Sequence, residues 1–428
     1  MERRSVVVTA PDVTESGYSG MGLRHVGLAT TLAEHHDVTV LVGGDPGNLD
    51  RRVNVSFMNS EPGARALLAA DVVISANAVR ARYLPRLRGR LMLDLYDPSY
   101  FEWLTLDTTT AAGRRPWMAR QIHAWRVALT TADAVFCANE RQRDLYLGML
   151  LGGSTTRRQL SFDEGSLRAR ILVVPNGMPA EPPPALEGAR NRLGFSPDDV
   201  VFLWGGGVWD WLDWRTVVEA AIAAHAQNES VKLVFLGLSR GSVDDPHATR
   251  TRELVSFVES CDPTSQCVHY NEQWVSPAER ADYLAAANAA VLGQYNTLET
   301  RFSFRTRFVD CAWASLPIVT MNNDALSEKA ANEGWALLSA PGDVQGMTRN
   351  MLAVANDRDL QMRMASAVAA ARGQYSWAHA AAPVSEAINA LTLPTTRQRI
   401  DRMRQYAPSV MRTAVERYLP ARPRSGQI

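Results

Sequence analysis

The 428-residue chain is 46% hydrophobic and 21% charged, as in globular proteins large enough for two or three domains. Its 45 basic and 45 acidic residues cancel, which argues against a general polyanion binder whose affinity depends on neutralising phosphates. Only Lys232 and Lys329 are lysines, so an anion site in this protein would be built mostly from arginines or backbone amides.

The cysteines and the apolar segments predict where the protein works. Cys137, Cys261, Cys267 and Cys311 form no CxxC pair, and we expect buried thiols in a reducing cytoplasm. No signal peptide precedes the first predicted strand, and no apolar run reaches the roughly eighteen residues needed to span a bilayer. These features predict a cytoplasmic protein without a transmembrane segment.

Apolar strands alternate with helices along the first part of the chain. The predicted strands are 5–11, 37–44, 71–77, 90–98, 134–139 and 170–177. The predicted helices are 24–36, 122–132 and 140–150. Because these strands lack a polar face, they indicate a parallel sheet that helices cover on both sides.

The same pattern starts again after the prolines at 182–184, which can continue neither a helix nor a central strand. The predicted strands are 199–207, 231–238, 267–273, 289–295 and 317–322. The predicted helices are 213–227, 248–260, 277–287 and 305–316. We therefore predict an α/β protein with two Rossmann-like domains. Its predicted parts are domain 1–180, linker 181–192, domain 193–385 and a C-terminal helical segment at 386–428 that packs back on the first domain.

The order of these elements resembles the GT-B glycosyltransferases, in which two Rossmann-like domains face each other across a cleft. Three stretches resemble segments of that class: RHVGLATTLAEHHDVTVLVG (24–43), ILVVPNGMP (171–179) and ASLPIVT (314–320). Three others resemble more narrowly the family-four-like bacterial enzymes of polysaccharide and natural-product clusters: WGGGVWDWLDW (204–214), QWVSPAERADYL (273–284) and ETRFSFRTRFVDCAWASLPIVT (299–320). The resemblance covers about 5–385 and implies transfer of a sugar, with retention, from a nucleotide diphosphate donor.

An arginine cluster stands at the predicted start of a helix in the second domain, the half that binds the donor in this class. A transferase must stabilise the charge that grows on the leaving diphosphate, and arginine offers phosphate a planar, bidentate fork. We therefore predict that Arg305 and Arg307 bind the phosphates, and Arg305 is also a catalytic candidate. Ser303 and Thr306 belong to the same predicted site. The alternative for the two arginines is a salt bridge with Glu299 or Asp310.

The resemblance also implies a nucleoside contact. Retaining members often carry two glutamates separated by seven residues, and the second binds the ribose hydroxyls. The second position falls on Asp310, which can accept ribose hydrogen bonds, and the first falls on Phe302, which cannot. The role of the first glutamate is therefore expected at Glu299. The alternative for Asp310 is that it caps a neighbouring helix.

The predicted donor loop departs from the family, because Gly205, Gly206 and Gly207 stand where a Gly-Arg pair is common. Such a loop offers only backbone amides to phosphates, and a close approach of the backbone would explain the glycines. The alternative is a flexible turn. Three more donor contacts are expected: Arg240 for phosphate, and Trp274 and Val275 near the nucleobase. The tryptophans of the loop either pack or form the sugar pocket: Trp209, Trp211 and Trp214.

The first domain is expected to bind the acceptor. Gly20 and Gly22 follow the first strand in a G-x-x-G-x-G order, which is not the dinucleotide fingerprint, and the loop is expected to approach the donor diphosphate. Asp97 follows a strand at the edge where open α/β sheets bind ligands, so it is the leading candidate for an acceptor contact or proton acceptor. A turn-forming role before Pro98 is the alternative. His25 is the second candidate for this role. The alternative is that it caps the helix that it opens or packs against its neighbours.

These features predict a glycosyltransferase that uses no metal and no cofactor. Its expected partners are a nucleotide-sugar donor, based on UDP, GDP or dTDP, and a small-molecule or carrier-linked acceptor, but neither nucleic acid nor a membrane span. Two alternatives stay open: a GT-B sugar-nucleotide epimerase and a silent homologue that binds sugar nucleotides without turnover. A homodimer also stays open.

Overall fold

The computed structural model divides into two compact units, which are described separately. Unit 1 comprises 1–96, 115–174 and 381–428, and unit 2 comprises 97–114 and 175–380. The structure describes the whole chain except residues 1–2, 15–16, 19, 77–82, 84–85, 97, 99–100, 106–117, 120–121, 123–124, 126–128, 130–131, 153–163, 184–187, 239–247, 273–274, 276 and 396–428.

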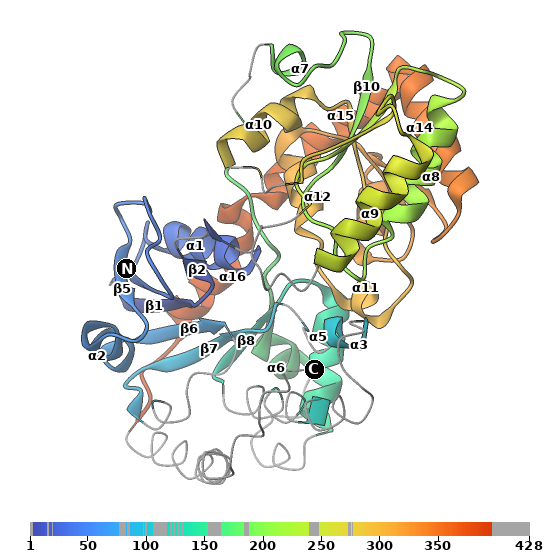
Figure 1. Cartoon of the computed structure of the whole chain (residues 1–428). Coiled ribbons are helices and arrows are strands. Elements are labelled where there is room, and N and C mark those ends of the chain that lie inside the picture. Colours follow the sequence, from blue (N-terminus) through green and yellow to red (C-terminus); the bar gives the residue numbers. More distant parts are fainter. Residues whose placement is uncertain are drawn as a thin grey trace, which may run out of the picture. The chain divides into compact units, whose positions relative to one another are not determined.

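Unit 1 is built on a seven-stranded parallel sheet with the order β5-β4-β1-β6-β7-β8-β9 (Figure 1). Its strands are β1 (Ser5–Ala10), β4 (Asp37–Val42), β5 (Asn54–Phe57), β6 (Val72–Ala76), β7 (Arg90–Asp94), β8 (Ala134–Cys137) and β9 (Ile171–Val173). A separate antiparallel pair joins β2 (Val13–Thr14) and β3 (Gly17–Tyr18). The valines of the central strand β1 are almost completely buried, as expected for a sheet with helices on both faces.

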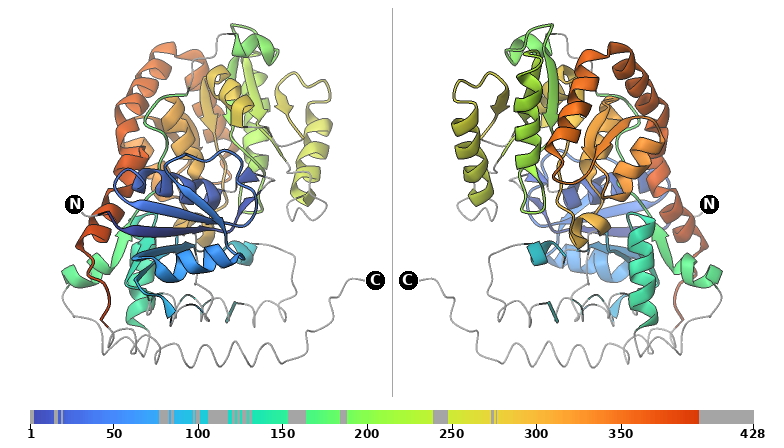
Figure 2. Two further views of the ribbon diagram at one scale, coloured as in Figure 1. Left: turned by 90° about the vertical axis from the view of Figure 1, so that its left-hand side faces the viewer. Right: turned by 90° about the vertical axis from the view of Figure 1, so that its right-hand side faces the viewer.

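Helices cover both faces of this sheet. They include α1 (Gly20–Leu32), α2 (Glu61–Ala69), α5 (Glu140–Leu151) and α6 (Glu164–Arg170). Figure 2 shows α1 on one face and α2 and α5 on the other. The side chain of Ser60 caps α2, and that of Asn139 caps α5, by accepting backbone N–H bonds from the first turn.

Unit 2 contains a six-stranded parallel sheet with the order β12-β11-β10-β13-β14-β15. Its strands are β10 (Val200–Trp204), β11 (Val231–Phe235), β12 (Val268–Tyr270), β13 (Ala289–Val291), β14 (Ile318–Met321) and β15 (Ala336–Ser339). The chain order reverses between β10 and β13. Ligands of open α/β sheets bind outside the carboxyl ends of the strands at such a switch point.

The helices of unit 2 lie on both sides of its sheet, with α8 and α9 on one side and α10 and α12 on the other in Figure 1. They are α3 (Glu102–Thr105), α7 (Ala189–Arg192), α8 (Trp214–His225), α9 (Ala248–Cys261), α10 (Pro277–Ala286), α11 (Leu298–Phe302), α12 (Thr306–Ala314), α13 (Ala325–Asn332), α14 (Val344–Asn356), α15 (Arg358–Ala371) and the 3-10 helix η3 (Arg372–Tyr375). The helix α16 (Trp377–Ala390) begins in unit 2 and ends in unit 1. Within the described residues, every helix is too short or too polar to traverse a bilayer.

The predicted α/β class and the two parallel sheets are confirmed, and every predicted strand contains an observed one. Two strands of the large sheets, β5 and β15, were missed, and each lies at a sheet edge. β5 is largely exposed and carries no continuous apolar run, and the two middle residues of β15 are only partly buried. Most of the predicted helix 122–132 and the last part of the predicted C-terminal segment, 396–428, lie outside the described residues.

The cysteines differ in part from the expectation of buried thiols. All four are free, and Cys137, Cys267 and Cys311 are buried. Cys261 is exposed, because it occupies the last position of α9 and its side chain faces solvent. The expectation was therefore wrong for this residue.

A close contact at Gly293 fixes the end of β13 against the start of α8. The amide of Asp213 donates to the Gly293 carbonyl at 3.0 Å. A Cβ atom at Gly293 would overlap the Asp213 carbonyl oxygen and lie 2.8 Å from Cγ2 of Val217. Asp213 also caps α8, since its Oδ1 accepts the Thr216 amide at 3.1 Å. Only glycine allows the strand and the capped helix to approach this closely.

Gly293→Ala should therefore lower the free energy of unfolding, by about 1–3 kcal/mol as in other overpacked sites. Thermal unfolding followed by circular dichroism measures the change. Gly148→Ala is the matched control: this glycine lies inside α5 with open space around it, so alanine should stabilise by about 0.5–1 kcal/mol. Equal effects of the two substitutions would contradict the close contact.

Candidate functional site

Three segments of unit 2 meet at the carboxyl ends of β10 and β13. They are the glycine loop 205–207 after β10, Gln294 after β13, and the turn between α11 and α12. Arg307 of α12 donates to the Gly207 carbonyl, and Arg305 donates to Oε1 of Gln294 at 2.9 Å. The predicted arginine cluster and the predicted glycine loop therefore lie at the topological switch point of the sheet.

Arg305 is buried, and all three of its guanidinium nitrogens donate to protein atoms. Its two Nη atoms bind the two carboxylate oxygens of Glu299 at 2.7 and 2.6 Å, and Nη2 also donates to Oγ1 of Thr300 at 3.2 Å. Burial alone would lower the pKa of Arg305, but the neighbouring Glu299 carboxylate raises it overall. The fork that was predicted to bind phosphate is therefore engaged by Glu299, and the structure favours the salt-bridge alternative for Arg305.

This ion pair continues into a longer chain of buried hydrogen bonds. The amide nitrogen of Gln294 donates to Oδ2 of Asp324. The other oxygen of Asp324 accepts the amides of Leu326 and Ser327 at 2.7 and 3.0 Å and so caps α13. The chain thus ties the end of β13 to the starts of α11, α12 and α13.

Arg307 has a different environment from Arg305. Its Nη2 donates to the Gly207 carbonyl, its guanidinium carbon lies 5.0 Å from the ring centre of Trp204, and its Nη1 is buried without a hydrogen-bond partner. Burial, and after it the charge of Arg305, lower the pKa of Arg307 to about 9, so the group stays charged at neutral pH. Within the described residues, no carboxylate forms an ion pair with it. Arg307 is thus a partly buried cation whose Nη1 is enclosed and with which no described carboxylate is paired.

The glycine loop 205–207 is in direct contact with the Arg307 guanidinium. Gly206 has a φ of +112°, in the left-handed region that favours glycine. A Cβ atom there would lie 3.6 Å from Nη2 and 3.7 Å from Nε of Arg307. The Gly207 carbonyl also accepts a bond from Nε1 of Trp204 at 3.3 Å. The group that closely approaches the loop backbone in this structure is therefore the guanidinium of Arg307. The hydrogen bonds to the Gly207 carbonyl argue against the alternative of a flexible turn.

The N-terminus of α12 completes this part of the site. Arg305 is its N-cap residue, and the Arg305 side chain does not cap the first-turn amides. Unsatisfied amides at a helix N-terminus carry partial positive charge and favour anions. Thr306 begins the helix and is partly exposed. Ser303 is buried and donates to the Thr300 carbonyl at 3.3 Å, so its hydroxyl is directed toward α11.

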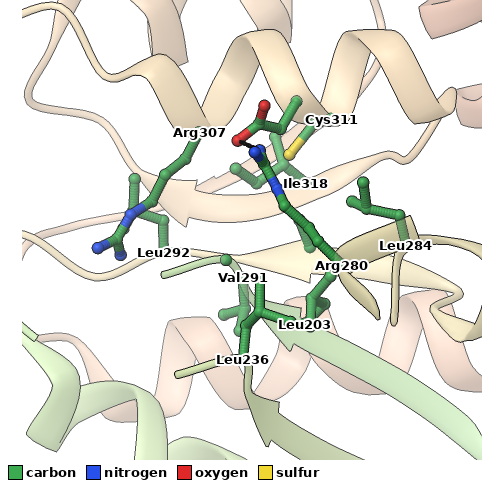
Figure 3. A pocket seen from close by; sticks show the side chains of 12 residues that line it. Leu203, Leu236, Arg280, Leu284, Val291, Leu292, Arg307, Cys311 and Ile318 are labelled. Atoms are coloured by element: carbon green, nitrogen blue, oxygen red, sulfur yellow. Dashed lines mark ion pairs between the residues drawn. The ribbon is translucent and has the colours of Figure 1, made fainter. Parts of the chain in front are cut away.

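A small cavity of about 20 Å³, with room for about one water molecule, lies beside Arg307. Its lining comes from β10, β13, β14, α10, α12 and neighbouring loop residues, and it includes Arg280 and Asp310. These two side chains form an ion pair and are each about one-third exposed. Figure 3 shows Arg280 and Arg307 lying apart along the lining, with an ion pair drawn only at Arg280.

The pairing of Asp310 bears on its predicted ribose contact, because Arg280 already occupies one of its oxygens. Sequence analysis did not identify Arg280 as a site residue. Arg280 lies in α10 and Asp310 in α12, thirty positions later, so no short-range sequence pattern predicts that they pair. The structure does not support the alternative that Asp310 caps a helix, because its observed partner is the Arg280 side chain and not a backbone amide.

The aromatic residues around the loop mostly pack. Trp211 and Trp214 are buried, and the Trp209 ring, which is partly exposed, stacks on Trp211 at 6.1 Å. Phe302, at the expected first-glutamate position, stacks on Phe101 at 5.3 Å. Of the other expected donor contacts, Val275 is partly buried, and two lie outside the described residues: Arg240 and Trp274.

In unit 1 the acceptor candidates are only partly described. Asp97 lies outside the described residues, and Gly20 and Gly22 occupy the first turn of α1. His25 is completely buried, with Nε2 3.3 Å from Oδ2 of Asp94. It is therefore enclosed in unit 1, which favours the packing alternative over an acceptor contact.

Arg24 forms the second contact of Asp94, through Nε at 2.6 Å and Nη2 at 3.1 Å. Arg24, His25 and Asp94 are all fully buried at the carboxyl end of β7. Burial would raise the pKa of Asp94, but Arg24 and His25 outweigh it and lower the pKa to about 2. This triad joins α1 to the sheet.

Solved structures with a similar fold cover most of the chain. The sucrose-phosphate synthase of Thermosynechococcus elongatus matches with a TM-score of 0.62 and 16% identity, over 90% of this chain and 98% of its own. HepE of Anabaena in complex with UDP-glucose matches with a TM-score of 0.64 and 13% identity, over 91% and 100%. WaaG, a glycosyltransferase involved in lipopolysaccharide biosynthesis, matches with a TM-score of 0.61 and 14% identity, over 90% and 100%.

These likenesses show the fold, so the predicted GT-B fold is confirmed. No family model matches the chain, and no curated protein matches it. The roles of individual site residues therefore rest on the geometry described above.

Asp94→Asn should lower the free energy of unfolding by about 3–5 kcal/mol, because it leaves Arg24 buried without its counter-charge. The pKa of Asp94 is lowered from 3.8 to about 2, so its contribution is complete above pH 3.8 and is lost as the pH falls through 2. Acid unfolding of the wild type should therefore include a loss of stability in that window which the variant lacks. Asp37→Asn is the control, since its pair with Arg3 is exposed and should be worth about 0–1 kcal/mol. Similar losses in both variants would contradict the buried triad.

Proposed function

We propose that the protein is a glycosyltransferase that moves a sugar from a nucleoside diphosphate donor to a small-molecule or carrier-linked acceptor, with retention and without a metal ion. The observation that carries this proposal is Arg307, a partly buried cation with an enclosed Nη1 and no paired carboxylate among the described residues, beside a glycine loop and a helix N-terminus that its N-cap side chain does not cap. The resemblance to family-four-like enzymes supports retention, and the GT-B fold supports sugar transfer.

A diphosphate would supply what this site lacks. A partly buried charge without a paired carboxylate is unfavourable, and an anion placed against Arg307 would offset this by accepting charge-assisted hydrogen bonds from its guanidinium. The first-turn amides of α12 would meet the same anion. Gly206 leaves no side chain above the loop, so a phosphate can approach the backbone closely.

The same groups suit the chemistry of transfer. As the bond between the anomeric carbon and the phosphate oxygen breaks, negative charge grows on the leaving diphosphate, and fixed cationic groups stabilise that charge. The acceptor heteroatom forms the new bond, and its proton passes to the departing phosphate. No separate protein base is needed in such a step, so the enclosed position of His25 is compatible with it.

The solved relatives support the choice of donor. Structures of HepE hold UDP and UDP-glucose, and that protein has the same fold over its whole length. Thermal-shift measurements with UDP, GDP, dTDP and ADP test the proposal. A diphosphate at 100 times its Kd should stabilise the protein by about 2.7 kcal/mol. No shift with any of the four would count against the proposed function.

Arg307→Met should separate stability from binding. Because burial disfavours the charge of Arg307, the variant should unfold at the same temperature as the wild type or a higher one, while its affinity for the diphosphate falls roughly ten- to hundredfold. Calorimetric unfolding and titration measure the two effects. Arg349→Met on the exposed face of α14 is the control and should change neither. A lower melting temperature with normal affinity would show that Arg307 is structural.

Transfer should not require a divalent metal, because Arg307 and the amides of α12 provide positive charge at the proposed phosphate site. Product formation is measured after dialysis against EDTA, with and without added magnesium or manganese. Equal rates in both conditions are expected. Activity that disappears in EDTA and returns with either metal would overturn this part of the proposal.

A further inference from the structure

The buried hydrogen-bond chain beside the proposed phosphate site consists of Glu299, Arg305, Gln294 and Asp324, and we call it the clamp. All four side chains are at most 8% exposed. Both oxygens of Glu299, both ends of the Gln294 amide and all three nitrogens of Arg305 have partners within the clamp or at Thr300. The clamp therefore has no free group with which to bind a ligand.

The position of Arg305 explains what the clamp can do instead. Arg305 is the N-cap residue of α12, and Arg307 follows it by two positions. The backbone N–H of Phe308 donates to the Arg305 carbonyl at 3.0 Å, so the clamped residue starts the first turn of the helix. Holding the Arg305 side chain thus fixes the direction in which α12 begins.

Arg307 depends on this fixed start because its own contacts are few. Its one hydrogen bond to the protein goes from Nη2 to Gly207, as far as the described residues show, and Trp204 lies against its face. A long side chain with so little to hold it would otherwise lose its orientation. A buried ion pair contributes little net stability but imposes a specific geometry, which is the property this position needs.

We propose that Glu299 and Arg305 are positioning residues that hold the first turn of α12 so that Arg307 and the helix amides face the donor diphosphate. The proposal rests on the proposed function, because it assigns the clamp to that site. It distinguishes two neighbouring arginines: Arg307 touches the phosphates, whereas Arg305 acts through the helix it begins.

The experiment compares Glu299→Gln with Asp262→Asn, a control in the same unit. Asp262 is buried and accepts the amides of Gln266, Cys267 and Val268 at the start of β12, the edge strand that lies two places from β10 in the sheet. Both substitutions remove one buried charge without changing the shape of the side chain, so both should lower the melting temperature. Only Glu299→Gln should affect the site.

Two measurements distinguish positioning from general destabilisation. Hydrogen–deuterium exchange of peptides that cover α12 should become faster in Glu299→Gln and stay unchanged in the control. Titration with the nucleoside diphosphate that binds the wild type should show a roughly tenfold or greater loss of affinity in Glu299→Gln. The affinity for the corresponding nucleoside, which has no phosphate, should stay the same.

A double-mutant cycle tests whether Glu299 acts through Arg307. In an Arg307→Met background, Glu299→Gln should weaken diphosphate binding much less than in the wild type, because the group that it positions is gone. Thr300→Val is a milder substitute if Glu299→Gln does not fold. It removes one 3.2 Å hydrogen bond to Arg305 and should shift exchange and affinity in the same direction by smaller amounts.

The outcomes separate this inference from the proposed function. Unchanged exchange of α12, or additive losses in the cycle, would overturn the positioning role even if the wild type binds a diphosphate normally. A wild type that binds none of the four diphosphates would overturn the proposed function and the clamp's assignment with it. Faster exchange of α12, a loss confined to the diphosphate and non-additive effects would together support the inference.

Discussion

The ion pair between Arg305 and Glu299 is the interaction on which the arrangement of the site depends. It gives two arginines that are two residues apart opposite environments. Arg305 is neutralised by a carboxylate that meets both ends of its fork, whereas Arg307 has a carbonyl, an aromatic ring and one free nitrogen. The charges of Arg305 and Arg307 repel each other, so neutralising Arg305 makes Arg307 tolerable within the same short segment.

The partly buried charge of Arg307, which no described carboxylate pairs with, disfavours folding, and the rest of unit 2 must offset it. The six-stranded sheet and its helices bury a large apolar core, and Gly293 lets β13 pack directly against the start of α8. Such a framework can hold one unfavourable group in place. Sites that bind highly charged ligands commonly show this conflict, since the groups that complement the ligand destabilise the empty protein.

The sequence predicted the sheets well because their strands are continuous apolar runs, and buried parallel strands have that pattern. It missed the edge strands β5 and β15, which are only partly buried. It placed the arginine cluster at the start of a helix and the glycine loop directly after a strand, where the structure has them. It could not assign partners, because the choice between phosphate and carboxylate for Arg305 depends on how the turn between α11 and α12 brings Glu299 back to it. The Arg280–Asp310 pair joins separate helices and has no local pattern at all.

The relation between the loop and α12 explains the missing basic residue in the predicted donor loop. A Gly-Arg pair is common at this position in the family that the chain resembles, and this chain has three glycines directly after β10. In the structure the guanidinium of Arg307, which comes from another helix a hundred residues later, lies within 3.6 to 3.9 Å of the place where a Gly206 Cβ would be. The φ of +112° at Gly206 disfavours any side chain there, and a Cβ atom would already be in van der Waals contact with that guanidinium. The positive charge at the glycine loop therefore comes from Arg307 of α12 and not from a side chain of the loop itself.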